Sequence, residues 1–386
     1  MNSFERKLLE KIDKMWPCIV LVGATLLATA IRISLFPMVS FDLRISLLPW
    51  YEEIAVNGLY AQVGNYNLVY QLLIWFMTKL PIPAIYAYKI LSAIFDYSLA
   101  AAAALLVKKL ATEDKNWKAI WTYVVVLFCP IVFLNSSAWA QCDAIYASFA
   151  LFGLYFMLDE RYNLSLLSLG MAFVFKLHAV FILPVYLFVY FVRRKFSIVR
   201  FLIIPLTMVV TALPLLFWDR SLFDLVKIYL EQTGTYHAMG VNYPTVWAIL
   251  CDPIEPLNFR YLAVSAVLLT VGILAVIMVR WVRAAYSTNG KNLVIMAFIL
   301  CYTCVLFLPA MHERYGFIYE MCAIVLAVLL PKTIPLCIGL MLLSMSTYGY
   351  FLFEIPVNYY LLAWVNVALY TAYFFLLRTE LEKSKE

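Results

Sequence analysis

Apolar runs of about twenty residues recur along this chain of 386 residues, the first at residues 17–37 and the last at 357–377. A run of that length crosses the hydrocarbon core of a bilayer as an α-helix. The runs are continuous, whereas the strands of a membrane barrel would alternate polar and apolar residues. The sequence therefore predicts an all-α polytopic membrane protein, with a single integral membrane domain over residues 1–386.

Charged residues are few and lie in short clusters between the apolar runs. They make up 13% of the chain, and the formal net charge is +6. Lys and Arg in short loops mark the cytoplasmic side of a membrane, so these clusters orient the helices and do not indicate nucleic acid as a partner. Read in this way, they predict about 12 spans with both termini in the cytoplasm.

Two longer polar intervals are predicted on the opposite, external side. The first, about residues 38–83, contains an amphipathic pattern at 47–60 that predicts a helix lying on the membrane surface. Residues 66–80 are apolar but short for a span, which predicts a surface or re-entrant helix. The second interval is about residues 218–260.

Ionisable side chains gather on this external side. A charge at mid-depth in a bilayer is costly, so such residues usually occupy an aqueous cavity or an interface. The sequence therefore predicts a site that faces the external surface. In this topology the span ends on that side carry His178, His237 and His312, together with Asp42, Asp143, Lys176, Glu313 and Arg314.

Asp42 directly follows the first apolar run. A carboxylate in this position can be a helix N-cap or a solvated loop residue. It can also serve as a general base that takes a proton from an acceptor hydroxyl. The residue alone does not choose between these interpretations.

The sequence WAQCD at residues 139–143 opens a predicted span at about residues 138–158. Asp143 in the first turn of a helix is favoured by the helix dipole, which is one explanation of its place. Trp139, Gln141 and Asp143 so close together also suggest a sugar-binding platform, with a stacking ring and polar partners for hydroxyls. The external stretch NSSAWAQCD, residues 135–143, is expected to be exposed.

Two further motifs carry basic residues. FKLH at 175–178 places Lys176 and His178 at a span end, where snorkelling of Lys is the ordinary explanation. MHERYGF at 311–317 is denser in polar groups and includes His312 and Arg314. Together these four side chains are suited to a phosphate leaving group. The remaining candidates for sugar or acceptor binding are Asn242, Glu313 and Tyr315.

Other chemistries have little support in the sequence. The three histidines lack an HxxxH or similar paired spacing, so a divalent metal is not favoured. There is no GxGxxG or Walker loop and no large cytoplasmic domain to hold a nucleotide sugar. No cofactor is expected, and any transferred group must come from a donor reachable within the bilayer.

Taken in order, these motifs resemble polytopic glycosyltransferases of the GT-C fold, in particular bacterial proteins similar to the second mannosyltransferase of GPI-anchor synthesis, the PIG-V-like family. The resemblance extends over most of the chain. The motifs are Asp42 with Pro49, Trp50 and Gly58; Asn65 and Tyr66; Lys89 and Asp96; AQCDAIYASF at 140–149; FKLH followed by AVFILP; YPTVW at 243–247; and LPAMHERYGF at 308–317.

The resemblance implies a hexosyltransferase of the plasma membrane. Such an enzyme takes mannose or another hexose from a polyprenyl-phosphate donor and attaches it, with inversion, to a glycan, lipid or cell-wall polymer on the extracytoplasmic side. The family's acidic base falls on Asp42, and its phosphate-binding role falls on Lys176, His178, His312 and Arg314. The chain departs from the family pattern at His178, Thr245 and Ala310, where the family has glutamine, asparagine and a basic residue.

The main alternative is a lipid-linked glycan flippase or a secondary transporter, because many carriers also have about twelve spans with both termini inside. A carrier would place its functional polar groups near the bilayer midplane, often at broken helices in two related halves. A scaffold subunit without chemistry is a third interpretation. It would leave Asp42 and the MHERYGF motif without an explanation.

Overall fold

The computed structural model describes residues 3–60, 63–64, 66–234, 237–251 and 259–384. Within these ranges the chain forms α-helices and short 3-10 and π helices, and an isolated strand-like bridge joins Gly240 to Met311. The prediction of an all-α protein is confirmed. Asn65, one of the motif residues, lies outside the described residues.

Six described helices are long and apolar enough to cross a membrane, or seven if one bent pair counts as a single span. The multi-pass prediction is thereby confirmed, whereas the count of about twelve spans stays a prediction that requires the shorter helices to cross as well. The six are α1 (Ser3–Leu35), α4 (Ala84–Leu110), the segment Ile198–Trp218 that contains α10 (Ile203–Ala212), α13 (Phe259–Arg283), α16 (Ile334–Phe353) and α17 (Tyr359–Glu382).

Shorter apolar helices complete the bundle. α14 is buried throughout from Asn292 to Leu306, as expected for a helix that is apolar on every side. The shorter helices are α3 (Leu68–Met77), α7 (Asp143–Leu158), α8 (Tyr162–Phe175), α9 (Leu183–Arg193), α14 (Lys291–Phe307) and α15 (Phe317–Leu329).

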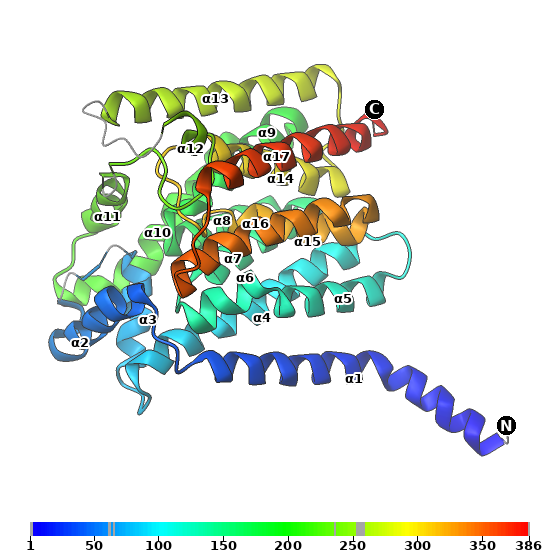
Figure 1. Cartoon of the computed structure of the whole chain (residues 1–386), viewed down its shortest axis with the longest axis horizontal. Coiled ribbons are helices and arrows are strands. Elements are labelled where there is room, and N and C mark those ends of the chain that lie inside the picture. The colour runs from blue at the N-terminus through cyan, green and yellow to red at the C-terminus, as the bar shows by residue number, and fades with distance from the viewer. Residues whose placement is uncertain (1–2, 61–62, 65, 235–236, 252–258, 385–386) are drawn as a thin grey trace.

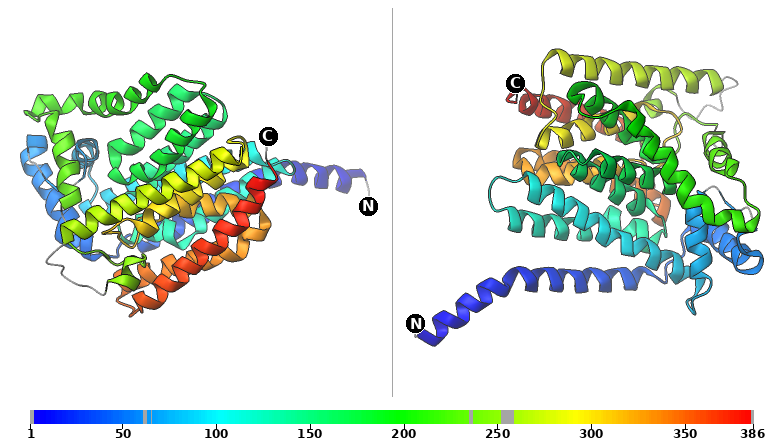
Figure 2. Two further views of the ribbon diagram at one scale, coloured as in Figure 1. Left: turned by 90° about the horizontal axis from the view of Figure 1, so that it is seen from above. Right: turned by 180° about the vertical axis from the view of Figure 1, so that it is seen from behind.

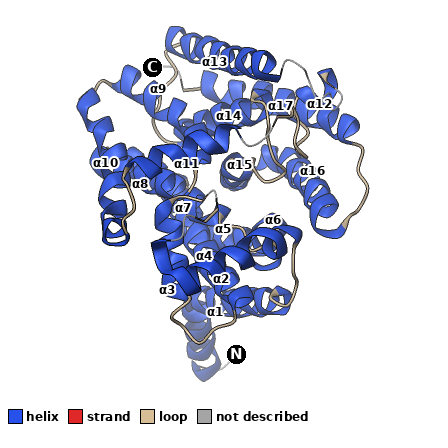
Figure 3. Cartoon of the chain, turned by 90° about the vertical axis from the view of Figure 1, so that its left-hand side faces the viewer, coloured by secondary structure: helices blue, strands red, loops and turns tan. Residues whose placement is uncertain are grey.

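The long helices differ in how much protein surrounds them. The most apolar window of α4 is 56% buried, but that of α1 is only 11% buried. Seen end-on in Figure 3, α13 and α1 lie on opposite outer sides of the bundle. Leu26 on α1 and Leu268 on α13 are about two-thirds exposed, at 66% and 67%. Apolar surface of this extent is stable in contact with lipid chains.

The helices run between two distinct ends (Figures 1 and 2). Both termini lie at one end, and α2 (Leu48–Asn57), α3 and α11 (Phe223–Gly234) lie at the other. We call these the basic end and the Asp42 end. Loops predicted to be cytoplasmic meet at the basic end: Lys109 pairs with Asp159, Arg193 Nε donates to Thr288 Oγ1 at 2.9 Å, and Lys291 Nζ lies 2.8 Å from Glu380 Oε2.

Amphipathic and broken segments cover the Asp42 end. As the sequence predicts, α2 is amphipathic: Tyr51 and Ile54 are buried, and Glu52 and Glu53 are exposed. The second polar interval contains α11 and the short α12 (Trp247–Leu250). Buried Arg220 links it to the first interval, because its guanidinium contacts Asp224 Oδ2 at 3.2 Å and Gln71 Oε1 at 3.3 Å.

Residues 129–142 correct the sequence analysis. The apolar run at residues 117–134 is not one continuous helix: α5 (Lys115–Phe128) ends at Phe128, because Pro130 cannot continue the hydrogen-bond ladder, and the chain bends by 51° between residues 115–128 and 130–138. The next long helix begins at Asp143 rather than near 138. Residues 134–142 are buried rather than exposed, since irregular backbone within a membrane protein is tolerated where protein encloses it.

A buried ion pair holds this broken segment against the first helices. Arg32 Nε on α1 donates to Asp96 Oδ2 on α4 at 2.8 Å, and both side chains are almost fully buried. Ser136 Oγ of the broken segment donates to the same carboxylate oxygen at 2.6 Å. One carboxylate therefore joins three segments that are distant in sequence.

We predict that Arg32→Met lowers the free energy of unfolding by about 3–5 kcal/mol, because it leaves the buried Asp96 carboxylate without its counter-charge. The double change Arg32→Met with Asp96→Asn should be less harmful than Arg32→Met alone. Reversible unfolding in mixed micelles measures both values. Lys195→Met, at an exposed pair with Glu160, is the control and should change stability little. Equal loss in the single and double variants would contradict the prediction.

Candidate active site

The backbone that leads to Asp42 is held by a buried lysine. Lys89 Nζ, on α4, donates to the carbonyl oxygens of Leu35 at 3.2 Å and Phe36 at 2.9 Å, and also to that of Met38. These carbonyls lie at and just beyond the end of α1, where the helix leaves its last carbonyls without partners. Lys89 therefore sets the direction in which the chain enters the Asp42 segment.

Ser40, rather than Asp42, makes the capping contact at the next helical turn. Its hydroxyl accepts the backbone N–H of Leu43 at 3.2 Å and donates to the carbonyl oxygen of Trp139 at 3.0 Å. The side chain of Asp42 makes no capping hydrogen bond. Asp42 therefore occupies the N-cap position of the short π helix Leu43–Leu47 without capping it, and its carboxylate is directed elsewhere.

Two side chains of the broken segment hold the Asp42 carboxylate. Trp139 Nε1 and Gln141 Nε2 each donate to Asp42 Oδ2 at 2.9 Å. Arg314 Nη1 lies 4.0 Å from the same oxygen. The Asp42 side chain remains 27% exposed, so the carboxylate is oriented by its partners and still accessible to a ligand.

The amide of Gln141 is itself oriented by Tyr66. The Tyr66 hydroxyl donates to Gln141 Oε1 at 2.8 Å. Because the hydroxyl donates to the amide oxygen, the amide nitrogen is the end of the side chain that faces Asp42. Tyr66, Gln141 and Asp42 thus form one chain of hydrogen bonds with a defined direction.

Trp139 has a different environment from the one expected of a sugar platform. Its side chain is fully buried, with the Phe351 ring stacked at a centroid distance of 4.3 Å. The Arg314 guanidinium lies 5.3 Å from the ring centroid, and Tyr348 packs edge-on at 5.1 Å. In this conformation the indole offers no free face, and its polar contact is the N–H donated to Asp42.

Asp143, at the start of α7, lies between two cations. Its carboxylate pairs with Lys176 and lies 3.4 Å from Arg314 Nε. Asn135 Nδ2 also donates to it, at 2.8 Å. Burial by itself would lower the pKa of Arg314, but the negative charges of Asp143 and Glu313, together with the neighbouring Tyr66 and Tyr315, outweigh it and raise that pKa well above its ordinary value. The guanidinium is therefore permanently charged.

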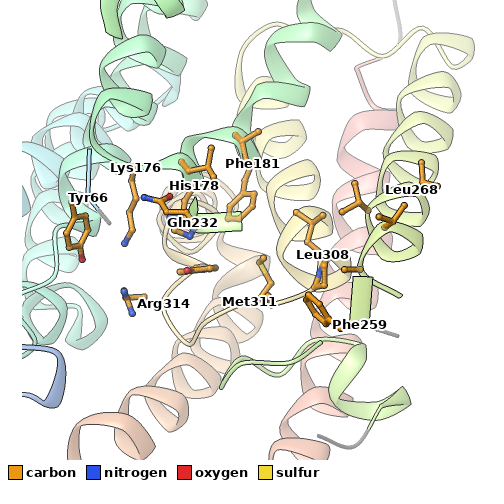
Figure 4. Close-up of a pocket in the computed structure, with 18 residues that line it drawn as sticks. Tyr66, Lys176, His178, Phe181, Gln232, Phe259, Leu268, Leu308, Met311 and Arg314 are labelled. Atoms are coloured by element: carbon orange, nitrogen blue, oxygen red, sulfur yellow. The ribbon is translucent and has the colours of Figure 1, made fainter. Parts of the chain in front are cut away.

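A cavity of about 450 Å³ extends from this cluster (Figure 4). At one side of the view Lys176 and Arg314 point toward the same space beside Tyr66. The opposite wall is apolar and includes Phe259 at the start of α13. The other apolar lining residues are Leu177, Val180, Phe181, Ala263, Val264, Val267, Leu268, Leu308, Pro309, Ala310 and Met311.

The two motif histidines occupy an aromatic cluster beside the cavity. The rings of His178 and Tyr315 have centroids 3.7 Å apart, and both residues line the cavity. The His312 ring lies 5.1 Å from that of Tyr315. Glu313 is fully buried behind them, with Oε1 3.2 Å from Arg314 Nη1, and it does not line the cavity. Its contacts hold Arg314 rather than a ligand.

The sequence candidates are therefore not all brought together. Asp42, Trp139, Gln141, Asp143, Lys176 and Arg314 form one contact cluster, which we call the Asp42 cluster. Asn242 is half-buried with a left-handed φ of 58°, and no contact described for residues 237–251 joins its side chain to this cluster. In the part of the chain that the structure describes, no group of His, Cys, Asp or Glu is placed to hold a metal ion.

Sequence reasoning missed Asn135, Gln232 and Tyr348. Gln232 lines the cavity from α11, and Tyr348 contacts both Trp139 and Asn135. Asn135 could have been identified from the sequence, because it directly follows an apolar run that Pro130 interrupts. A polar side chain in an apolar environment costs free energy unless it forms hydrogen bonds, which predicts a hydrogen-bond partner for Asn135. For Gln232 the sequence contains no comparable signal, since an amide in a polar interval is common.

No protein-family model matches this chain, and the search of curated proteins finds no significant match. The functional assignment therefore depends on the geometry of the Asp42 cluster and its cavity. That geometry combines a partly exposed carboxylate, two buried cations and a long apolar wall. These groups suit an amphiphilic anion with a polar head near Lys176 and Arg314.

We predict that farnesyl phosphate binds the purified chain more tightly than farnesol, because only the phosphate can pair with Lys176 and Arg314. Arg314→Gln should weaken farnesyl phosphate binding by about ten- to a hundredfold, the usual size for a lost charge-assisted hydrogen bond. Asp143 would keep Lys176 as its partner. Isothermal titration in neutral detergent measures the affinities, with exposed Arg200→Gln as control. Equal affinity for the alcohol and the phosphate would contradict this prediction.

Proposed function

We propose that this chain is a membrane-embedded glycosyltransferase that moves a hexose from a polyprenyl-phosphate donor to a hydroxyl acceptor, with inversion. The observation that carries the proposal is the place of Asp42. Its carboxylate is partly exposed and lies 4.0 Å from Arg314. Arg314 lines a cavity that has two cations, Lys176 and Arg314, at one side and an apolar wall at the other. A base and a phosphate-binding cation are thus adjacent.

The proposed reaction is a single displacement. Asp42 takes the proton of the acceptor hydroxyl as its oxygen attacks the anomeric carbon of the donor sugar. The bond from that carbon to the phosphate oxygen breaks, and the phosphate leaves with the electron pair. Trp139 and Gln141 hold Asp42 Oδ2 in a set direction, which supports its role because a general base must be placed within hydrogen-bond reach of the proton.

Charge stabilisation would come from Lys176 and Arg314. Preorganised cations in a partly enclosed site stabilise negative charge that develops on a leaving group. Both are already paired with Asp143, so they are held in position before a donor arrives. The pairing also lowers the cost of keeping two cations buried in the empty site.

The apolar wall would take the lipid part of the donor. Val264 and Leu268 line the cavity from α13 and are themselves 54% and 67% exposed on the outside of the bundle. A cavity wall that is continuous with lipid-facing surface allows a polyprenyl chain to remain in the bilayer while its phosphate head reaches Arg314. This arrangement favours a lipid-linked donor over a soluble nucleotide sugar.

The finer assignments rest on the motif resemblance. They are the GT-C fold, a hexose such as mannose as the transferred sugar, a glycan, lipid or cell-wall polymer as acceptor, and a site on the extracytoplasmic side of the plasma membrane. The phosphate-binding role of His178 and His312 and the acceptor-binding role of Tyr315 and Asn242 belong to the same proposal. The flippase alternative predicts donor movement without release of polyprenyl phosphate.

We expect Asp42→Asn to reduce sugar transfer by about a hundred- to ten-thousandfold, the usual contribution of a positioned base. Binding of the polyprenyl-phosphate sugar should remain, because the cavity residues are unchanged. The measurement is release of free polyprenyl phosphate by purified protein given a panel of donors. Glu53→Gln, an exposed carboxylate on α2, is the matched control and should keep full activity.

Near-normal turnover by Asp42→Asn would remove Asp42 from the role of base. No release from any donor by the unmodified chain, together with movement of lipid-linked sugar across a vesicle membrane, would favour the flippase instead.

Tyr66→Phe should lower the turnover number about fivefold to tenfold, the size of one lost hydrogen bond. Without the hydroxyl, the Gln141 amide is free to rotate and present its oxygen to Asp42, and no hydrogen bond can form because the ionised carboxylate and the amide oxygen are both acceptors. Tyr60→Phe is the control, because Tyr60 is 60% exposed at the same end of the bundle. The same transfer assay measures both variants, and an unchanged turnover number for Tyr66→Phe would show that Gln141 needs no such orientation.

A further inference from the structure

A second cavity, of about 220 Å³, lies at the basic end of the bundle. It is enclosed by α13, α14 and α17, which lie close together in Figure 1. Two arginines, Arg280 of α13 and Arg378 of α17, line it together with the aromatic residues Trp281 and Tyr286. The remaining lining residues are Ile277, Ala284, Ile299, Phe374 and Leu381.

This cavity is separate from the Asp42 cluster. Phe259, at one end of α13, lines the first cavity, and Arg280, near the other end, lines the second. At a rise of 1.5 Å per residue, that stretch of helix is about 30 Å long. That length matches the hydrocarbon thickness of a bilayer, so a membrane-spanning α13 places the two cavities near opposite membrane surfaces.

The two arginines of the second cavity differ in their partners. Arg378 Nε lies 2.8 Å from Glu382, a pair that is half-exposed and holds the guanidinium in place. For Arg280, no carboxylate of the described residues lies within ion-pair distance, and the residue is exposed. Nearby, a single carboxylate, Glu380, is shared by Lys291, Lys332 and Lys383. Cations therefore outnumber carboxylates around the cavity.

The rest of the cavity is apolar, and exposed apolar side chains lie beside it on the surface of the bundle. Ile277, Phe374 and Ile299 form its inner wall. On the outer surface beside it, Val276 of α13 is 54% exposed and Phe375 of α17 is 60% exposed. A ligand in this place therefore meets two guanidinium groups at the membrane surface and apolar side chains directly below them.

We propose that this second cavity binds the headgroup of an anionic phospholipid, with the phosphodiester between Arg280 and Arg378 and the start of an acyl chain against Ile277 and Phe374. Arginine forks match phosphate oxygens, and basic pockets between helices at a membrane surface bind anionic headgroups. The apolar wall and its lipid-facing surroundings favour a lipid over free phosphate. This inference does not depend on the proposed glycosyl transfer.

The bound ligand would join α13 to α17. α13 contributes one wall of the first cavity, and its outer position leaves it with few protein neighbours. A lipid whose phosphate contacts both Arg280 and Arg378 would hold the basic end of α13 against α17. Binding should therefore also raise the thermal stability of the chain, because a ligand that binds only the folded state stabilises it.

The test is a titration of the full chain, purified in neutral detergent, with dioleoylphosphatidylglycerol, dioleoylphosphatidylcholine or inorganic phosphate. Bound lipid is counted by native mass spectrometry, and the unfolding temperature is recorded in parallel. We expect phosphatidylglycerol to bind and to raise the unfolding temperature more than the other two probes. The variant Arg280→Gln with Arg378→Gln should bind phosphatidylglycerol about thirtyfold more weakly, the size expected for two basic contacts to an anionic lipid.

Two further variants make the result specific. Lys108→Gln with Lys115→Gln removes the same charge from exposed positions elsewhere at the basic end, and it should keep the wild-type affinity. Ala284→Phe fills the cavity without a change of charge and should also weaken binding. If the double arginine variant fails to fold, Ala284→Phe alone decides the outcome.

Three results would overturn the proposal. Equal binding of phosphatidylglycerol and phosphatidylcholine would show that charge is not recognised. An equal rise of the unfolding temperature with inorganic phosphate would show that the site takes a free anion. Unchanged phosphatidylglycerol binding by Ala284→Phe, with an equal loss in both double variants, would show a diffuse surface charge effect.

Discussion

The ion pairs of Asp143 with Lys176 and Arg314 are the constraint on which the site depends. All three side chains are buried or nearly so, and a buried charge without a partner is strongly destabilising. The start of α7, the end of α8 and the loop before α15 must therefore meet at one point. The first cavity lies beside that point, between Lys176 and Arg314 on one side and the start of α13 on the other.

The position of Asp42 follows from the same arrangement. Its two hydrogen-bond donors, Trp139 and Gln141, belong to the irregular segment that directly precedes Asp143. On the other side, Lys89 holds the end of α1, and Ser40 joins the Asp42 segment to the backbone of Trp139. The carboxylate is thus placed by contacts from two directions, which gives it a set orientation while part of it remains accessible.

Some of this could be predicted from residue patterns and some could not. The last predicted apolar run, residues 357–377, corresponds to α17, Tyr359–Glu382, because about twenty apolar residues leave little choice of structure. The amphipathic pattern of α2 also identified its buried face. The break at residues 129–142 was missed, although Pro130 marks it, because the apolar composition continues through Phe133. The burial of Trp139 was missed because nothing local indicates that Phe351 covers it.

By itself, the sequence determined the helical class, the multi-pass character and the grouping of basic loops, because these depend on hydropathy and charge along the chain. It also singled out Asp42, Lys176 and Arg314 as candidates. Only the tertiary structure decided that Asp42 faces Arg314, that Gln141 is oriented by Tyr66, and that a cavity runs from Arg314 and Tyr66 along α13. The reason is physical: buried charges must find partners, and those partners lie far away in sequence.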